Sequence, residues 1–284
     1  MVIFRKTADL QDFLLKHRAT GTRKTGFVPT MGALHQGHIS LLNIAKEDNN
    51  LAVVSIFVNP TQFNDKSDYN QYPESVDQDI LMLEEAGCDV LLLPDVNEIY
   101  PGGPGKMQTF GFGYLDTLLE GAHRPGHFKG VGQVVARLLD VVNPDKLYMG
   151  QKDYQQCIVI SHLLQLLGND KDIELVICPT VREADGLAMS SRNRRLTESQ
   201  RALAGSLYQC LVSIQAKQQS TPFHIVQKEC FDLLTEKGLT PEYISLADAN
   251  DLTELDNYTD NRKMVALLAA KLGDVRLIDN MVIN

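Results

Sequence analysis

Short apolar runs alternate with amphipathic segments through the first two thirds of this chain, and this alternation constrains its fold most. The run at residues 51–58 (LAVVSIFV) is uninterrupted, as expected for a strand buried on both faces of a parallel sheet. The repeated βα pattern predicts an α/β fold with a doubly wound, Rossmann-like parallel sheet. We expect strands at 25–30, 51–58, 88–93, 146–149 and 173–178, and helices at 32–46 (opened by a turn), 75–86, 131–142 and 154–167.

The pattern changes after about residue 181. Thr197 begins a long predicted helix with a capping sequence that puts Gln200 at the third helical position, and a second helix follows Pro222 and ends near Gly238. Apolar runs at 243–247, 264–271 and 275–278 predict a small, mostly antiparallel sheet. We therefore expect two domains that pack together, a Rossmann-like domain over 1–181 and a smaller α+β domain over 182–284.

The charge balance restricts the binding partners. With 27 Lys and Arg against 36 Asp and Glu, the net charge is −9, so the chain lacks the broad basic surface of a nucleic-acid binder. No apolar run approaches the roughly 18 residues that a membrane-spanning helix needs, and charges interrupt the N-terminus as they would not in a signal peptide. Five cysteines without a Cys-x-x-Cys pair indicate structural thiols in a reducing cytoplasm.

The segment at residues 29–38 (PTMGALHQGH) lies where the first of these strands ends and a helix begins. Ligands bind at the carboxyl ends of strands in doubly wound sheets, and a helix N-terminus offers N–H groups that suit phosphate. His35 and His38 share one face of a helical turn, while Gly32 and Gly37 allow a nucleotide to approach closely. The pair also suits a polar surface or a metal site. No third ligand has close spacing, so we favour phosphate over zinc and expect no direct metal ligand.

These residues resemble a known family. His35-Gln-Gly-His38 is similar to the His-x-Gly-His signature of the nucleotidylyltransferase superfamily, and the longer string PTMGALHQGH resembles the pantothenate synthetase family. Further segments resemble that family in order and spacing: FVNPTQF at 57–63, GQKDYQQ at 150–156, READGLAMSSRN at 182–193 and RLIDN at 276–280. The resemblance covers nearly the whole chain. It implies an ATP-dependent ligase that activates pantoate as an acyl-adenylate and transfers the acyl group to β-alanine.

Residue chemistry alone leaves several roles open. Gln62 either binds substrate or forms a hydrogen bond to the backbone of its own loop. Lys152 supplies a point charge for phosphate. Asp153 caps a helix, binds a ribose hydroxyl or reaches Mg²⁺ through water, and Arg192 either binds phosphate or is solvated within the run 192–195.

The family resemblance implies more specific roles. It implies that His35, His38 and Lys152 are catalytic, with His38 as the proton donor, and that the enzyme uses Mg²⁺ and forms a homodimer. The implied pantoate and β-alanine contacts are Met31, Gln62 and Gln156. The implied ATP contacts are Met31, Gly32, Ala33, Leu34, His35, Gln36, Gly37, His38, Gly150, Gln151, Lys152, Asp153, Val181 (at the adenine), Met189, Ser190, Ser191 and Arg192, the last four being a mobile Met-Ser-Ser-Arg loop of the second domain.

Other functions share part of this pattern. A plain nucleotidylyltransferase would need no acyl-acceptor pocket. An aminoacyl-tRNA synthetase would carry a basic extension that binds tRNA. A nucleotide-binding module without catalytic activity would need neither histidine. The polar stretch 64–75 is a candidate lid beside Gln62. The Gly-rich stretch 121–128 is expected to be a loop that lines the cleft or covers a subunit interface.

Overall fold

The computed structural model describes residues 1–19, 21, 24–64, 66–260 and 262–283, and the chain divides into two compact units. The first unit comprises residues 1–150 and 159–178, and the second comprises residues 151–158 and 179–284. The sequence did not indicate that residues 151–158 group with the second unit. As functional domains, 1–181 and 182–284 stay a prediction.

The first unit contains a six-stranded, wholly parallel sheet in the order β1-β4-β3-β2-β5-β6. Every residue of β3 is buried, as predicted for a strand covered on both faces. The sheet thus confirms the predicted doubly wound architecture. Its strands are β1 (Val2–Phe4), β2 (Thr25–Thr30), β3 (Leu51–Ile56), β4 (Val90–Leu92), β5 (Lys146–Gly150) and β6 (Glu174–Cys178).

The order of the strands reverses between β2 and β5. From β2 the chain steps outward to β3 and then β4, and it returns to the other side of β2 to form β5 and β6. Phe27 of β2 pairs with Leu147 of β5, so the two strands are direct neighbours. In open α/β sheets ligands bind beyond the carboxyl ends of the strands at such a switch point. The segments that follow Thr30 and Gly150 therefore begin where a ligand is expected.

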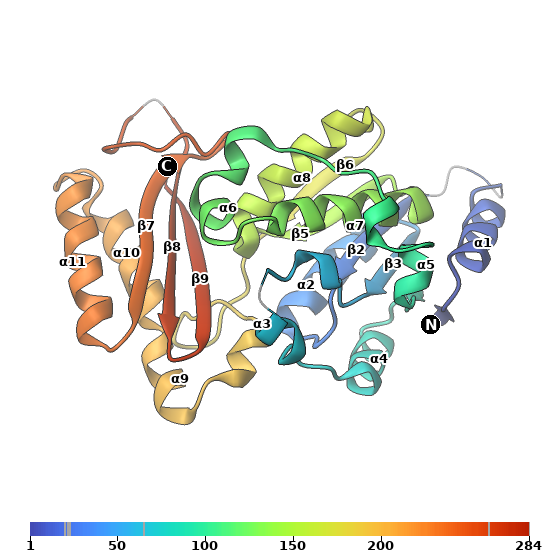
Figure 1. Cartoon of the computed structure of the whole chain (residues 1–284), viewed down its shortest axis with the longest axis horizontal. Coiled ribbons are helices and arrows are strands. Elements are labelled where there is room, and N and C mark those ends of the chain that lie inside the picture. The colour runs from blue at the N-terminus through green and yellow to red at the C-terminus, as the bar shows by residue number, and fades with distance from the viewer. Residues whose placement is uncertain (20, 22–23, 65, 261, 284) are drawn as a thin grey trace. The chain divides into compact units, whose positions relative to one another are not determined.

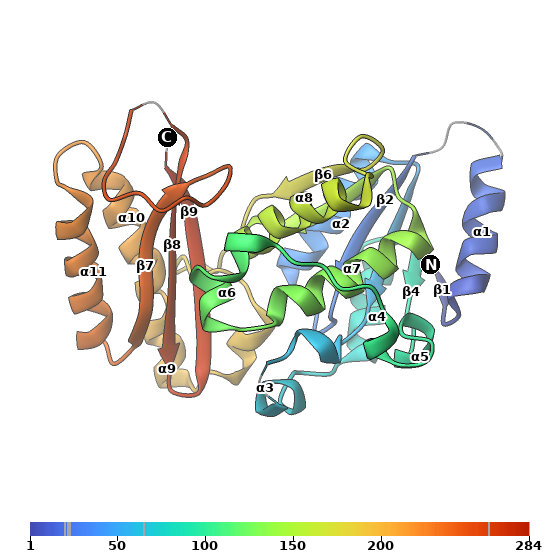
Figure 2. The same cartoon turned by 45° about the horizontal axis from the view of Figure 1, so that its top comes forward.

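Helices cover both faces of this sheet (Figures 1 and 2). Connections between parallel strands are almost always right-handed, which puts the helices that follow β2 and β3 on one face. Leu42 and Leu83 of these helices belong to one buried core with Val54 of the sheet. The helices of the first unit are α1 (Thr7–Ala19), α2 (Gln36–Asp48), α3 (Lys66–Asn70), α4 (Val76–Glu85), α5 (Val96–Ile99), α6 (Leu119–His123), α7 (His127–Val142) and α8 (Tyr154–Leu167), whose first five residues group with the second unit.

The stretch 121–128 is not the loop that the sequence suggested. It contains the end of α6 and the start of α7. Gly121 is needed for close packing, because a Cβ there would collide with the carbonyl oxygen of Leu115. Gly126 precedes α7 with φ +82°, a left-handed conformation that glycine adopts readily. The glycines here permit close helix packing and a sharp turn. The prediction of a loop from the high number of glycines was therefore wrong.

The second unit contains a three-stranded antiparallel sheet with helices α10 and α11 beside it (Figure 1). The capping box at Thr197 and Gln200 is present as predicted, but the single long helix expected there is interrupted at Gly205. Leu211, Val226 and Leu268 belong to one buried core between the helices and the sheet. The elements are α9 (Glu198–Ala204), α10 (Ser206–Lys217), α11 (Phe223–Glu236), β7 (Thr240–Asp248), β8 (Met264–Leu272) and β9 (Val275–Ile283).

Within the part of the chain that the structure describes, no helix combines the length and the apolarity needed to span a membrane.

Candidate active site

His35 and His38 cap helix α2 together. The N–H of Gly37 donates to Nδ1 of His35 at 3.2 Å, and the N–H of His35 donates to Nδ1 of His38 at 3.3 Å. The two rings lie 4.0 Å apart between centroids. A backbone N–H can only donate, so each Nδ1 acts as an acceptor and the proton of each neutral ring is assigned to Nε2. Both histidines therefore offer an N–H donor at the ring atom away from the backbone.

This cap changes one expectation from the sequence. The start of α2 was expected to offer backbone N–H groups to phosphate, but the N–H groups of His35 and Gly37 already donate to histidine rings. The N–H of His38 donates to the carbonyl oxygen of His35 at 2.8 Å. In this structure the N–H groups of His35, Gly37 and His38 are therefore already engaged within the turn, and the histidine side chains add further donors that suit an anion.

The residues between β2 and the histidines have an unusual backbone. Gly32 and Ala33 have φ +78° and +50°, both in the left-handed region that a residue with a Cβ rarely adopts. The N–H groups of Ala33 and Leu34 each donate at 2.8 Å to the carboxylate of Asp79 on α4. Asp79 was not among the predicted site residues, because an acidic residue in the first turn of a helix usually just complements the helix dipole.

Gln62 is buried and its amide is held on both sides. Its Nε2 contacts Sδ of Met31 at 2.9 Å, and its Oε1 accepts from Nδ2 of Asn59 at 3.1 Å. Asn59 in turn accepts a hydrogen bond of 2.7 Å from the hydroxyl of Tyr100. The structure therefore brings together Met31 and Gln62, two of the predicted substrate contacts.

His127, in the stretch that was misread as a loop, contacts the same segment. Its Nδ1 lies 2.8 Å from the carbonyl oxygen of Gln62, and its Nε2 lies 3.0 Å from Nη1 of Arg124. A carbonyl only accepts and a guanidinium only donates, so Nδ1 of His127 carries the proton and Nε2 accepts. His127 thus supports the backbone of Gln62. The Gly-rich sequence around it contained no signal for this role.

Lys152 follows β5 in a 3-10 turn (Gln151–Asp153) that the second unit holds in place. Nδ2 of Asn280 on β9 donates to the carbonyl oxygens of Gln151 and Lys152 at 2.9 and 2.8 Å. Nζ of Lys152 lies 3.4 Å from Oδ1 of Asp153, whose side chain is exposed, and Gln156 is half-buried in α8. Asn280, in the C-terminal motif RLIDN, therefore fixes the backbone of the turn that carries Lys152.

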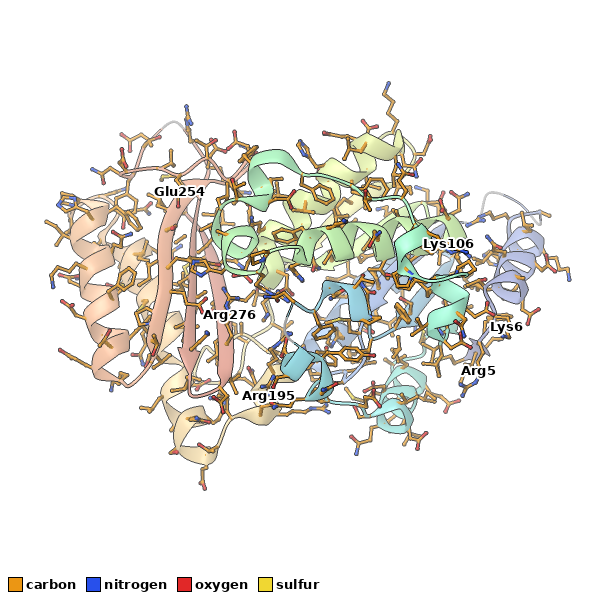
Figure 3. The ribbon with its side chains drawn as sticks, viewed as in Figure 1. Arg5, Lys6, Lys106, Arg195, Glu254 and Arg276 are labelled. Atoms are coloured by element: carbon orange, nitrogen blue, oxygen red, sulfur yellow. The ribbon has the colours of Figure 1, made fainter. Side chains whose placement is uncertain are left out.

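Val181 and the Met-Ser-Ser-Arg segment lie side by side. The N–H of Met189 donates to the carbonyl oxygen of Val181 at 3.0 Å, next to a β-bridge between Arg182 and Ala188. Ser190 caps the 3-10 helix Ser191–Arg195 by accepting from the N–H of Arg192 at 3.3 Å, and Figure 3 labels Arg195 at its end. The predicted adenine contact and the predicted phosphate loop are thus neighbours.

A buried ion pair stabilises this part of the second unit. Both terminal nitrogens of Arg182 donate to the carboxylate of Asp279, at 2.6 and 3.0 Å, and its guanidinium lies 4.4 Å over the ring of Tyr208. Burial raises the pKa of Asp279 above its ordinary value, although Arg182 lowers it. Arg276, labelled in Figure 3, begins the same C-terminal motif and pairs with Glu242 at 2.7 Å.

The predicted site residues therefore fall into two groups. The first unit holds 31–38, Gln62 and Gly150; the second holds 151–153, Gln156, Val181 and 189–192.

Comparisons with known proteins find matches over nearly the whole chain. The sequence profile of the family described as pantoate-beta-alanine ligase matches residues 2–282. Pantothenate synthetase of Cytophaga hutchinsonii is 46% identical over 94% of this chain and 95% of its own, and that of Porphyromonas gingivalis is 44% identical over 99% of both.

Solved structures are similar over the same length. Pantothenate synthetase of Thermus thermophilus has a TM-score of 0.90 and 37% identity, covering 99% of both chains. Pantoate-beta-alanine ligase of Francisella tularensis, complexed with beta-gamma ATP and beta-alanine, has a TM-score of 0.82 and 36% identity, covering 99% of this chain and 97% of its own.

Proposed function

Because this chain belongs to the pantoate-beta-alanine ligase family, we propose that it condenses pantoate with β-alanine and converts ATP to AMP and pyrophosphate through a pantoyl-adenylate. The observation that carries this proposal is the turn at residues 35–38, where two histidines offer Nε2–H donors beyond the carboxyl end of β2. That place is the topological switch point, where a nucleotide is expected in such a sheet.

Adenylation must overcome charge repulsion. The pantoate carboxylate attacks the α-phosphorus of an anionic triphosphate, and two like unit charges 4 Å apart repel by about 1 kcal/mol in water and about 4 kcal/mol at an effective dielectric of 20. We assign cationic charge at the phosphates to Lys152 and Arg192. His35 and His38 donate hydrogen bonds to the charge that develops in the transition state. His38 is the proton donor in this scheme.

Nucleotide contacts come from residues 31–38, 150–153, Val181 and 189–192. The Mg²⁺ that accompanies ATP would be held mainly by phosphate oxygens and water, as is usual for this ion. Asp153 fits such a contact through water, since its side chain is 49% exposed and presents carboxylate oxygens beside Lys152. When bound, Mg²⁺ would lower the negative charge of the triphosphate.

The second step is acyl transfer. The amine of β-alanine, after losing a proton, attacks the acyl carbon of the adenylate, and the bond from that carbon to the AMP oxygen breaks. We assign pantoate and β-alanine contacts to Gln62 and Gln156, because an amide can hold a hydroxyl and a carboxylate without adding charge. We assign a further contact to Met31, because its sulfur lies 2.9 Å from the amide nitrogen of Gln62. The mixed anhydride must be protected from water. Residues 64–75 would act as the lid; Asp65 within them lies outside the described residues.

We further propose that the enzyme acts in the cytoplasm as a homodimer. All five cysteines are buried, which fits structural thiols in a reducing compartment. The dimer rests on the family resemblance, and sedimentation equilibrium of the purified protein tests it.

Pyrophosphate exchange tests the order of the chemistry. If adenylation comes first, the enzyme should exchange labelled pyrophosphate into ATP when pantoate is present and β-alanine is absent, because the first half-reaction needs no amine. The measurement is the rate at which label enters ATP, with and without pantoate. A plain nucleotidylyltransferase would exchange label without pantoate, and an acyl-phosphate route would release ADP. Either result would overturn the proposed function.

Substitutions of Gln62 and of Lys152 should change different kinetic constants of the enzyme. Gln62→Ala should raise the KM for pantoate, because the side chain contacts that substrate, whereas Lys152→Ala should weaken the use of ATP or slow adenylation. Titration of each variant with both substrates measures the two effects, and the control is Lys171→Ala, a substitution of an exposed lysine in the turn before β6. A Lys152→Ala enzyme altered only in its dependence on β-alanine would contradict these assignments.

A further inference from the structure

Asp79 is a carboxylate with no exposed surface. It lies in the first turn of α4, on the face that packs into the first unit, and 0% of its surface is accessible. Ionised carboxylates are almost never fully buried unless other groups satisfy them. The hydrogen-bond donors around Asp79 therefore indicate its role.

Three donors converge on this carboxylate, and two come from the loop that precedes the catalytic histidines. Oδ2 accepts from the N–H of Ala33 and Oδ1 accepts from the N–H of Leu34, both at 2.8 Å. The hydroxyl of Ser75 donates to Oδ1 at 3.0 Å. Both carboxylate oxygens are thus engaged with the backbone just before His35, across 45 and 46 residues of sequence.

The loop at residues 32–34 has an unfavourable backbone conformation that hydrogen bonds to Asp79 would stabilise. Gly32 and Ala33 both have left-handed backbones, and Ala33 adopts this conformation in spite of its Cβ. A Cβ at Gly32 would lie 3.0 Å from both Oδ2 of Asp79 and the side chain of Ile56, so the loop also fits closely around the carboxylate. A backbone of this kind persists when surrounding contacts determine it. Asp79 supplies two of those contacts.

We propose that Asp79 is a positioning residue for the adenylation step, holding residues 33–34 so that the Nε2–H donors of His35 and His38 point where charge develops. This inference rests on the proposed function. Only a carboxylate suits the place, because two N–H groups approach its two oxygens. An asparagine would present one oxygen and one NH₂ group, and the NH₂ would face an N–H donor.

The decisive substitution is Asp79→Asn, with Asp77→Asn as the matched control. Asp77 lies in the same first turn of α4, but it is exposed. Asp79→Asn should lower the rate of pantoate-dependent pyrophosphate exchange about 10- to 100-fold, because misplacement of a catalytic group by about 1 Å has an effect of this size. Asp77→Asn should stay within about twofold of the wild type, as expected for an exposed charge without a role in positioning.

A double-mutant cycle with His38→Ala separates positioning from general support of the fold. If Asp79 acts through the histidine turn, Asp79→Asn should change the residual exchange rate of His38→Ala much less than it changes the wild-type rate. Equal fold-losses in both backgrounds, or a wild-type rate for a folded Asp79→Asn enzyme, would overturn the proposal. Pantoate-dependent exchange by the wild type is a separate result, so the proposed function can stand while this inference fails.

Ser75→Ala keeps the proposal testable if Asp79→Asn does not fold. It removes one donor from Oδ1 and leaves the carboxylate and both loop contacts in place. We expect a smaller loss of exchange, about threefold, in line with the modest net effect of one hydrogen bond. The loss should again disappear in the His38→Ala background. An identical loss in both backgrounds would count against positioning by Asp79.

Discussion

Replacing His38 with alanine should lower the turnover number by about 10²- to 10³-fold, which is the effect of removing one preorganised donor from a charge-stabilising site. The reason lies in the cap of α2. The N–H of His35 donates to Nδ1 of His38, which assigns the proton of the neutral ring to Nε2. Alanine removes that donor, and steady-state turnover at saturating substrates measures the loss.

The fold should survive this substitution. The cap bond that is lost is long, at 3.3 Å, and loss of a cap costs about 0.5–2 kcal/mol. Thermal unfolding of His38→Ala should therefore remain cooperative. His162→Ala is the matched control, because His162 is exposed on α8 in the first unit, and it should turn over like the wild type. A His38→Ala enzyme with the wild-type turnover number would remove His38 from the mechanism.

Five of the six strands of the parallel sheet were predicted, because each contains a short cluster of apolar residues. Residues 25–30 and 154–167 form β2 and α8 with the expected bounds. The N-terminal strand β1 was missed, because it has three residues, two of them exposed, and it exists through pairing with β4 some ninety residues away. Local sequence carries little information about an edge strand of this kind. Helix α1 (Thr7–Ala19) was also not predicted, because its apolar residues form only a weak amphipathic pattern.

The side chains proposed to react were predictable, whereas those that hold them were not. The histidine turn (residues 35–38) and the Lys152 turn (residues 151–153) are each formed by consecutive residues, so a short stretch of sequence is enough to recognise them. Asp79 contacts the histidine loop across 45 residues and Asn280 contacts the Lys152 turn across 128, so only the fold reveals their roles. The same reason explains why residues 151–158 group with the second unit: their contacts there include hydrogen bonds from Asn280 of β9 and to the carbonyl oxygen of Ala249, both distant in sequence.

Replacing Arg182 with alanine should reduce the free energy of unfolding by about 3–5 kcal/mol, because it leaves the buried carboxylate of Asp279 without its ion-pair partner. The Asp279 side chain is 1% exposed and accepts two hydrogen bonds from Arg182. Denaturant unfolding at neutral pH measures the change. Arg201→Ala is the matched control in the same unit. Arg201 also pairs with an aspartate, Asp185, but the two side chains are 33% and 39% exposed. That pair should contribute about 1 kcal/mol or less.

The destabilisation by Arg182→Ala should also depend on pH in a defined direction. Burial raises the pKa of Asp279 above its ordinary value, and Arg182 opposes that rise, so removing Arg182 should raise the pKa further. Between the unfolded value, about 3.9, and the raised folded value, the folded state holds more protons than the unfolded state, so stability falls as pH rises. The deficit of Arg182→Ala relative to the wild type should therefore be largest at neutral pH and should shrink as the pH falls towards about 4. Unfolding curves at several pH values test this. A deficit that stayed constant, or grew in acid, would show that Asp279 does not carry the buried charge that Arg182 neutralises.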